Sequence, residues 1–253
     1  MECMVNQKVS VLCVIPARYK SSRFEGKPLA LINGIPMIKR TYNQVVKSTL
    51  LDKVIVATDD LKIKDYCDEE KIPVFMTSDK CLTGTDRVAE VANYLDYDFY
   101  INVQGDEPVI EHKVIDQLVN EYLKYKDQYI AYNLYKYIYD EKEIQSDTIV
   151  KVILNEKDEL MYMSRLPIPY SKSGLKSKFK HQVPVYGFTK KALQEFTKFN
   201  KTINEQFEDV ELLRFVDLGY KLKMTETDAN SIAVDVPTDV QKVEIFLIKN
   251  GLK

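Results

Sequence analysis

The chain has 253 residues, of which 45% are hydrophobic and 29% are charged, and its net charge at pH 7 is −2. This length and composition allow one α/β domain or two small ones, with a substantial core. A charge so close to neutral gives no support for nonspecific binding to nucleic acid or to a membrane surface, so neither is expected as a partner.

The cysteines of the chain form no metal-binding or redox motif. They are Cys3, Cys13, Cys67 and Cys81, without a CxxC pair, and the chain has only two histidines. A structural zinc site is therefore not expected, and the thiols are typical of a reduced protein. The amino terminus lacks the apolar stretch of a signal peptide, and no apolar run is long enough to span a membrane. We expect a soluble, cytoplasmic protein.

A predicted strand followed by a cationic loop is the most informative stretch of the sequence. The run 11–15 is apolar and rich in β-branched residues, which is typical of a buried strand, and Pro16 ends it. Four cations follow: Arg18, Lys20, Arg23 and Lys27. Fixed positive charges and backbone N–H groups at the carboxyl end of a strand suit a polyphosphate. A solvated basic loop is the alternative. The order of strand, cations, Gly-Lys-Pro and helix favours a loop that binds a nucleoside triphosphate, of neither the GxxxxGK[ST] nor the GxGxxG type.

The first half of the chain alternates predicted strands with predicted helices. Strands are expected at 11–15, 52–59, 74–76 and 99–103, with a short one at 29–32, and helices at about 36–48, 61–70, 86–95 and 111–124. This order predicts an α/β fold with a mostly parallel sheet and helices on both faces. Ligands of such sheets bind beyond the carboxyl ends of the strands. Arg18, Asp59, the run 83–87 and Asp106 all fall at that edge.

The second half of the chain has a different character. It begins with a tyrosine-rich strand at 131–139 and a β-hairpin of 150–154 with 160–163, and a lysine-rich, solvated loop is expected at 172–180. A strand at 183–188, helices at 190–199 and 208–218, a strand pair formed by 222–225 and the stretch before Val234, and a helix at 240–249 complete the prediction. We interpret residues 1–253 as one domain with a β-rich insertion at roughly 130–190.

Two aspartates are candidate metal ligands. Asp106 follows a buried strand and a glycine, and Asp235 ends a second apolar stretch just before Pro237. Two carboxylates at strand ends, beside a bound triphosphate, would hold Mg²⁺ through oxygen ligands. A turn aspartate that bonds its own backbone is the alternative for Asp106.

Other polar residues are candidates for substrate binding. The run 83–87, Thr-Gly-Thr-Asp-Arg, contains donors that could contact a base or a ribose, although a helix N-cap explains it equally well. Arg165, Tyr186, Glu211 and Arg214 lie in the irregular half and could line an acceptor pocket. From spacing alone, Glu211 and Arg214 are predicted to form one ion pair on a helix surface.

Taken together, these segments resemble the 3-deoxy-manno-octulosonate cytidylyltransferases (CMP-KDO synthetases), a branch of the CMP-sugar synthetases. The matching runs are IPARYKSSRFEGKPL, VATDD, MTS…TGTDR, NVQGDEP, IVKVIL, LMYMSRLPIPY, VYGF and VDVPTD, in the order of the family and over nearly the whole chain. The resemblance implies a nucleotidyltransferase sheet flanked by helices, with a smaller β-rich insertion that pairs two subunits. It also implies that CTP and an acidic sugar are the substrates, that Mg²⁺ is the cofactor, and that the product serves lipopolysaccharide or capsule biosynthesis.

The resemblance implies a role for each site residue. Arg18, Arg23 and Lys27 would hold the CTP phosphates, with Arg18 and Lys27 catalytic; Thr77, Thr83, Gly84 and Arg87 would surround the cytidine; Gln104 would face the base or sugar; Asp106 and Asp235 would bind Mg²⁺; and Arg165, Gln182, Tyr186 and Glu211 would fall in the acid-sugar pocket.

The chain departs from the family pattern where the family binds the sugar acid. The family segment His-x-Gly-Ile-Tyr is Gln182-Val183-Pro184-Val185-Tyr186 here, and Glu-Gln-Leu-Arg is Glu211-Leu212-Leu213-Arg214. Gln182 and Leu212 thus replace two hydrogen-bonding groups. We hypothesise that the acceptor is a modified octulosonate, such as an amino-substituted or deoxy relative. The alternative is the plain octulosonate, with His181 in the vacated place.

The predicted reaction is attack of an acceptor hydroxyl on the α-phosphorus of CTP, with pyrophosphate leaving and no covalent intermediate. The same reaction on a different small acid is one alternative. A glycosyltransferase would place Asp-x-Asp where this chain has Gln104-Gly105-Asp106. A non-catalytic nucleotide sensor would tolerate loss of Asp106 and Asp235, and both are present.

Overall fold

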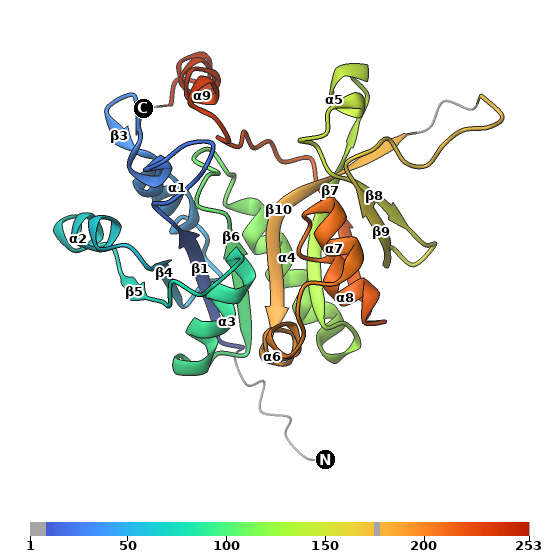
Figure 1. Ribbon diagram of the computed structural model, residues 1–253, viewed down its shortest axis with the longest axis horizontal. Coiled ribbons are helices and arrows are strands. Elements are labelled where there is room, and N and C mark those ends of the chain that lie inside the picture. Colours follow the sequence, from blue (N-terminus) through green and yellow to red (C-terminus); the bar gives the residue numbers. More distant parts are fainter. Residues whose placement is uncertain (1–8, 175–177, 253) are drawn as a thin grey trace.

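The computed structural model describes residues 9–174 and 178–252, which build a nine-stranded mixed sheet with helices on both faces (Figure 1). Cys3 and part of the lysine-rich loop predicted at 172–180 lie outside the described residues. Among the described helices, none is both long and apolar enough to cross a membrane.

The parallel half of the sheet is centred on β1 (Val11–Ala17). This strand pairs in parallel with β4 (Lys53–Thr58) on one side and β6 (Phe99–Val103) on the other, and β5 (Val74–Met76) follows β4. All seven residues of β1 are buried, as expected for a strand that is covered on both faces. The prediction that Pro16 ends this strand is wrong, because Pro16 and Ala17 still pair with Ala57 and Thr58 of β4. The predicted mostly parallel α/β sheet is confirmed.

The second half of the sheet begins at β10 (Phe179–Thr189), which pairs antiparallel with β6 and with β7 (Ala131–Ile138). The last strand, β11 (Leu222–Glu226), runs parallel to β7. The strand order is therefore β11-β7-β10-β6-β1-β4-β5. The antiparallel strand β10 thus joins the parallel strands β6, β1, β4 and β5 to the tyrosine-rich strand β7 and its neighbour β11.

The predicted β-hairpin is formed by β8 (Lys151–Leu154) and β9 (Leu160–Ser164). β8 joins it to the amino-terminal end of β10 (Figure 1), and the turn of the hairpin is bridged to β11, where the N–H of Met224 donates to the carbonyl of Asp158 (2.9 Å). A separate two-stranded ribbon consists of β2 (Leu31–Ile32) and β3 (Ile35–Pro36).

The helices cover the sheet in two layers. Their bounds are α1 Met37–Val45, α2 Leu61–Glu69, α3 Gly84–Tyr94, α4 Lys113–Tyr125, α5 Glu141–Gln145, α6 Lys190–Lys198, α7 Ile203–Glu208, α8 Leu213–Asp217 and α9 Pro237–Lys249, with 3-10 turns at Lys27–Leu29 and Lys126–Gln128. On one face, residues of α3, α6 and α8 form one hydrophobic cluster with alternate residues of β1, such as Leu12 and Val14. On the other face, residues of α1, α2 and α4 form a second cluster with Cys13 and Ile15.

Two element predictions in the second half are wrong. The helix expected at 208–218 is shorter: α7 ends at Glu208, where the left-handed Asp209 (φ 49°) follows, and helical structure resumes only in α8 from Leu213. The stretch before Val234 is not a strand. Instead, the backbone N–H of Val234 donates to the carbonyl of Asp106 (3.0 Å), which fastens this segment to the end of β6.

Candidate functional site

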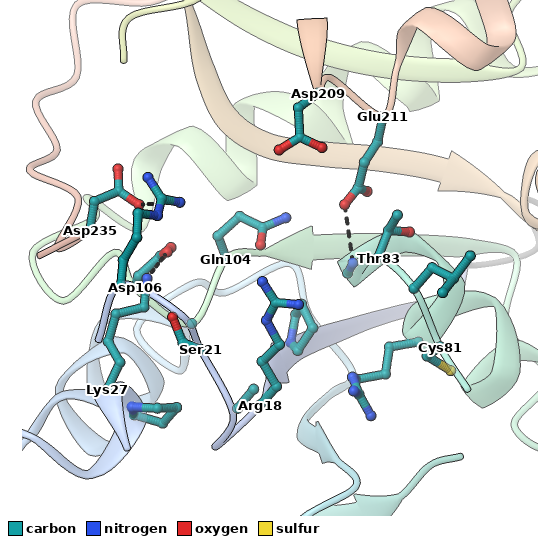
Figure 2. A pocket seen from close by; sticks show the side chains of 18 of the residues that line it. Arg18, Ser21, Lys27, Cys81, Thr83, Gln104, Asp106, Asp209, Glu211 and Asp235 are labelled. Atoms are coloured by element: carbon teal, nitrogen blue, oxygen red, sulfur yellow. Dashed lines mark hydrogen bonds and ion pairs between the residues drawn. The ribbon is translucent and has the colours of Figure 1, made fainter. Parts of the chain in front are cut away.

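Two adjoining pockets lie at the carboxyl ends of β1 and β6. The small pocket, of about 240 Å³, lies between the loop that follows β1 and the start of α3 (Figure 2). The large pocket, of about 800 Å³, extends toward β10 and the hairpin. Six residues line both pockets: Arg23, Gln104, Asp106, Asp209, Glu211 and Asp235.

The cationic loop forms one wall of the small pocket. Arg18, Arg23 and Lys27 all line it, as the sequence predicts for a phosphate-binding loop. Gly26 adopts a left-handed conformation (φ 69°), and its N–H donates to the carbonyl of Tyr19 (2.8 Å), so the loop turns back toward β1. This turn directs the side chain of Lys27 to the end of β6.

Each candidate metal ligand is paired with a cation of that loop. Nζ of Lys27 lies 2.6 Å from Oδ2 of Asp106 and donates to the carbonyl of Val234 (2.9 Å). The guanidinium of Arg23 lies 3.3 Å from Asp235. The backbone bond between Val234 and Asp106 brings the two aspartates to the same place, although they lie far apart in the sequence.

The carboxylates of Asp106 and Asp235 suit Mg²⁺ only when a bound triphosphate supplies further oxygen ligands. Within the described ranges 9–174 and 178–252, no three His, Cys, Asp or Glu side chains gather into a metal site. Two carboxylates leave most of an octahedral coordination sphere open, and phosphate oxygens and water are the ligands that Mg²⁺ prefers there. The residues therefore fit a metal that binds with a triphosphate.

Two glycines let the walls of the site approach closely. A Cβ atom on Gly84 would lie 3.2 Å from Nε2 of Gln104, and one on Gly105 would lie 2.7 Å from the carbonyl oxygen of Pro16. Real Cβ atoms do not lie as close to a backbone oxygen as the position on Gly105 would, and the position on Gly84 would crowd the Gln104 side chain. The ends of β1 and β6 and the start of α3 can therefore meet around Gln104, which lines both pockets.

The first backbone N–H groups of α3 are already hydrogen-bonded to side chains of the protein. The hydroxyl of Thr83 accepts the N–H of Asp86 (3.1 Å), whose carboxylate accepts the N–H of Thr83 (2.9 Å), so the N-cap alternative is confirmed as geometry. Glu211 accepts the N–H groups of Gly84 and Thr85, both at 3.1 Å. Thr83 and Gly84 still line the small pocket.

Arg87 lines the small pocket from a buried position. Its guanidinium donates to the hydroxyl of Thr77 and pairs with Asp59 at 3.1 Å. Thr77 itself is buried and is not among the lining residues of either pocket. Thr77 therefore holds the guanidinium of Arg87 in place and does not itself line a pocket.

The large pocket is lined on the β10 side by Gln182 and Tyr186, both buried. Burial raises the pKa of Tyr186 well above its usual range. Nε2 of Gln182 has no hydrogen-bond partner among the described residues. Gln182 therefore has a buried, neutral N–H donor that no described group uses.

His181 also lines the large pocket. Burial of its ring, with the nearby charges of Lys136 and Lys151, lowers its pKa to about 3. At neutral pH it is therefore uncharged. Leu212, by contrast, is 1% exposed and belongs to the hydrophobic core. The expectation that Leu212 replaces an acceptor contact is wrong, because it lines neither pocket.

Arg165 lines the large pocket, but the surrounding backbone holds its guanidinium. Its N–H groups donate to the carbonyls of Glu208 (2.6 Å), Asp147 (2.8 Å) and Asp209 (3.3 Å). Three of the five N–H donors of the side chain are thus used within the protein. The remaining two N–H donors of Arg165 are available to a substrate.

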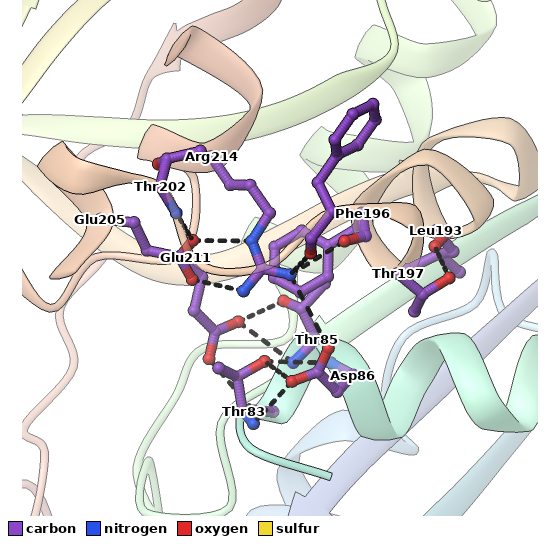
Figure 3. A network of polar contacts seen from close by, with 12 residues as sticks. Thr83, Thr85, Asp86, Leu193, Phe196, Thr197, Thr202, Glu205, Glu211 and Arg214 are labelled. Atoms are coloured by element: carbon purple, nitrogen blue, oxygen red, sulfur yellow. Dashed lines mark hydrogen bonds and ion pairs between the residues drawn. The ribbon is translucent and has the colours of Figure 1, made fainter. Parts of the chain in front are cut away.

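The predicted ion pair between Glu211 and Arg214 is wrong. Arg214 is buried, donates to both carboxylate oxygens of Glu205 at 2.6 Å, and stacks 3.6 Å from the ring of Phe196 (Figure 3). The spacing rule fails because the two residues do not lie on one continuous helix. The break after Asp209 points Glu211 toward α3 instead.

The sequence did not single out Glu107, which is 2% exposed and lines the large pocket. The hydroxyl of Ser231 donates to its carboxylate. Burial and the neighbouring charge of Asp106 raise the pKa of Glu107 to about 8. Its position directly after Asp106 in the run NVQGDEP is the signal that could have identified it.

Comparisons with known proteins assign the family. The family model described as cytidylyltransferase matches residues 12–224. The 3-deoxy-manno-octulosonate cytidylyltransferase of Fusobacterium nucleatum is 39% identical over 244 residues, which cover 96% of this chain and 98% of the relative. The chain belongs to the 3-deoxy-manno-octulosonate cytidylyltransferase family. It is therefore a nucleotidyltransferase, neither a glycosyltransferase nor a nucleotide sensor.

Two further proteins resemble this cytidylyltransferase. The 8-amino-3,8-dideoxy-manno-octulosonate cytidylyltransferase of Shewanella pealeana is 36% identical over 242 residues, which cover 94% of this chain and 99% of the relative. A solved structure of CMP:2-keto-3-deoxy-manno-octonic acid synthetase complexed with CTP matches with a TM-score of 0.89 and 32% identity, covering 95% of this chain and 99% of that one. The predicted family and fold class are confirmed.

Proposed function

We propose that this cytidylyltransferase couples CTP to an octulosonate-type acidic sugar and releases pyrophosphate. The observation that carries the proposal is the meeting of two pockets at Gln104, Asp106 and Asp235. One pocket has a wall of cations suited to phosphates, and the other has buried hydrogen-bonding groups suited to a sugar. A reaction that joins two substrates needs such a common edge.

The triphosphate of CTP would bind to Arg18, Arg23 and Lys27. A phosphate oxygen is a stronger competitor for these cations than one carboxylate, because the triphosphate carries several charges. Binding would draw Lys27 away from Asp106 and Arg23 away from Asp235. The two carboxylates would then be free, at the place where the phosphates lie.

Asp106 and Asp235 would hold Mg²⁺ in this arrangement, and the bound ion would neutralise charge on the phosphates. Arg18 and Lys27 would stabilise the charge that develops on the α-phosphate and the leaving pyrophosphate. Arg87, Thr83 and Gly84 would lie beside the cytidine. The acceptor hydroxyl would approach the α-phosphorus from the large pocket, past Gln104.

The acceptor would lie against Gln182, Tyr186 and Arg165 in the large pocket. The free N–H of Gln182 is suited to a hydroxyl or carboxylate oxygen of the sugar. The hypothesis of a modified acceptor now depends on Gln182 alone, since Leu212 lies in the core. We retain the octulosonate and its amino-substituted relatives as the acceptor class.

We also propose that the whole chain is one domain that forms a homodimer. Exposed apolar side chains cluster on and after β9 and on the adjoining α7: Met161, Leu166, Tyr170, Ile203 and Phe207. The hydroxyl of Ser164 bonds Glu208, which joins the two elements. An interface would remove these side chains from water. A cytoplasmic location belongs to the same proposal and is consistent with the free thiols of Cys13 and Cys67.

The substrates are tested by pyrophosphate release with each of CTP, ATP, GTP and UTP. The acceptors are 3-deoxy-manno-octulosonate and its 8-amino relative, side by side. We expect turnover with CTP in clear preference to the other three nucleotides, because the residues around the small pocket belong to a cytidylyltransferase. Equal turnover with UTP would contradict the assignment of the base. No turnover of CTP with either acid would contradict the acceptor class.

The metal site is tested by Asp106→Asn and Asp235→Asn. Each change removes one carboxylate charge, and turnover should fall by at least about a hundredfold, roughly 2.7 kcal/mol of barrier, while the fold is retained. Asp96→Asn, at an exposed residue outside both pockets, is the matched control and should leave turnover unchanged. Near wild-type turnover of either variant at saturating Mg²⁺ would show that its aspartate is not a metal ligand.

The dimer is tested by the mass in solution. We expect twice the 29.4 kDa of the chain at micromolar concentration. Phe207→Glu should shift the mass toward the monomer, because the charge would be buried at the interface. Leu61→Glu, at a similarly exposed apolar residue on α2, should not. A monomeric mass for the wild-type protein would contradict the proposed homodimer.

A further inference from the structure

Residues 208–214, the link between α7 and α8 together with the helix ends that flank it, line both pockets and are held by hydrogen bonds on three sides. On the nucleotide side, the carboxylate of Glu211 accepts the N–H groups of Gly84 and Thr85, at 3.1 Å each, and the hydroxyl of Thr85. These are the first residues of α3. Glu211 also lines both pockets.

On the acceptor side, the same segment is fastened to the end of β9. The carboxylate of Glu208 accepts the hydroxyl of Ser164 (2.7 Å) and the backbone N–H of Arg165 (2.8 Å). The guanidinium of Arg165 donates to the carbonyls of Glu208 and Asp209. A shift of this segment would therefore move the wall of the large pocket.

Behind the segment, Arg214 provides a rigid support. Besides its two bonds to Glu205, it donates to the carbonyls of Phe196 (2.9 Å) and Phe199 (3.2 Å), and it lies 3.9 Å from Asp86 (Figure 3). Asp86 is the third residue of α3, and its carboxylate accepts the N–H of the N-cap residue Thr83. The start of α3 is thus joined to the segment twice, through Glu211 and through Arg214.

Thr85 is the member of this network that can be changed without altering a pocket wall. Its side chain is completely buried and lines neither pocket. Burial raises the pKa of Glu211, and the bonds from Thr85 and Gly84 oppose that shift. The hydroxyl of Thr85 therefore helps to hold a buried carboxylate in place.

We propose that Thr85 and Glu211 are positioning residues that couple the CTP pocket to the acceptor pocket through residues 208–214. The inference depends on the proposed function, since it assigns how the two substrate sites are held together. Glu211 acts here through α3 as well as toward the acceptor. Loss of the Thr85 hydroxyl loosens one carboxylate that lines both pockets, so both substrates are affected.

The test is Thr85→Val, which removes the hydroxyl and keeps the shape of the side chain. We expect KM to rise about fivefold or more for both CTP and 3-deoxy-manno-octulosonate. Thr85→Ser restores the hydroxyl and should return both values to within about twofold of wild type. Thr197→Val is the matched control, because its hydroxyl bonds carbonyls of its own helix. It should change neither KM.

A double variant keeps the test decisive if Thr85→Val also lowers stability. If the two residues act as one unit, Thr85→Val with Glu211→Gln should be no worse than Glu211→Gln alone. Effects that multiply would overturn the proposal, as would a rise in the KM of the acceptor with that of CTP unchanged. Wild-type KM values for both substrates in Thr85→Val would overturn it as well. Failure of the proposed function is separate, because it would appear as a wild type that releases no pyrophosphate from CTP.

Discussion

The contact between Lys27 and Asp106 is the interaction on which the site depends. A cation from the loop after β1 reaches the carboxylate at the end of β6 and also the carbonyl of Val234. Together with the pair Arg23–Asp235, it brings three separate parts of the chain to one edge of the sheet. Charges of opposite sign are balanced there, and the arrival of a polyphosphate would change every partner in this set.

The sheet explains why this edge is available. β1, β4 and β6 are parallel, so their carboxyl ends meet at one edge, as in other open α/β sheets. β10 is antiparallel to β6 and brings Gln182 and Tyr186 to the neighbouring pocket. The reversal of direction at β6–β10 therefore places a second substrate pocket beside the first. Residues 208–214 lie between the two pockets and line both of them.

Much of this arrangement was predictable from the sequence. Buried parallel strands are continuous apolar runs, so β1, β4 and β6 were found at nearly their observed bounds. Polar residues that directly follow such strands must lie at the common edge, which is why Arg18, Lys27 and Asp106 were placed together. Asp235 was a candidate because it ends an apolar stretch expected to be a strand; the structure holds that stretch instead by the backbone bond of Val234 to Asp106, which no local pattern records.

The remaining errors come from interactions between distant segments. The left-handed Asp209 breaks a helix that local propensity continues, so Glu211 faces α3 and Arg214 faces Glu205. Leu212 looked like a lost substrate contact in the motif, but its side chain packs in the core. Thr77 matched a cytidine motif, and the structure shows it bonded to Arg87. In each case the motif gave the residue, and only tertiary packing gives the direction of its side chain.

We expect CTP to exchange the cations on Asp106 and Asp235 for a metal ion, so that metal and nucleotide bind together. The most direct measurement titrates Mn²⁺, as a paramagnetic substitute for Mg²⁺, and follows free Mn²⁺ by electron paramagnetic resonance. The titration is done with the protein alone, with CTP alone and with both. We predict that Mn²⁺ binds weakly to the protein alone and much more tightly to the protein with CTP than to either component. Equal Mn²⁺ affinity of the protein with and without CTP would contradict it.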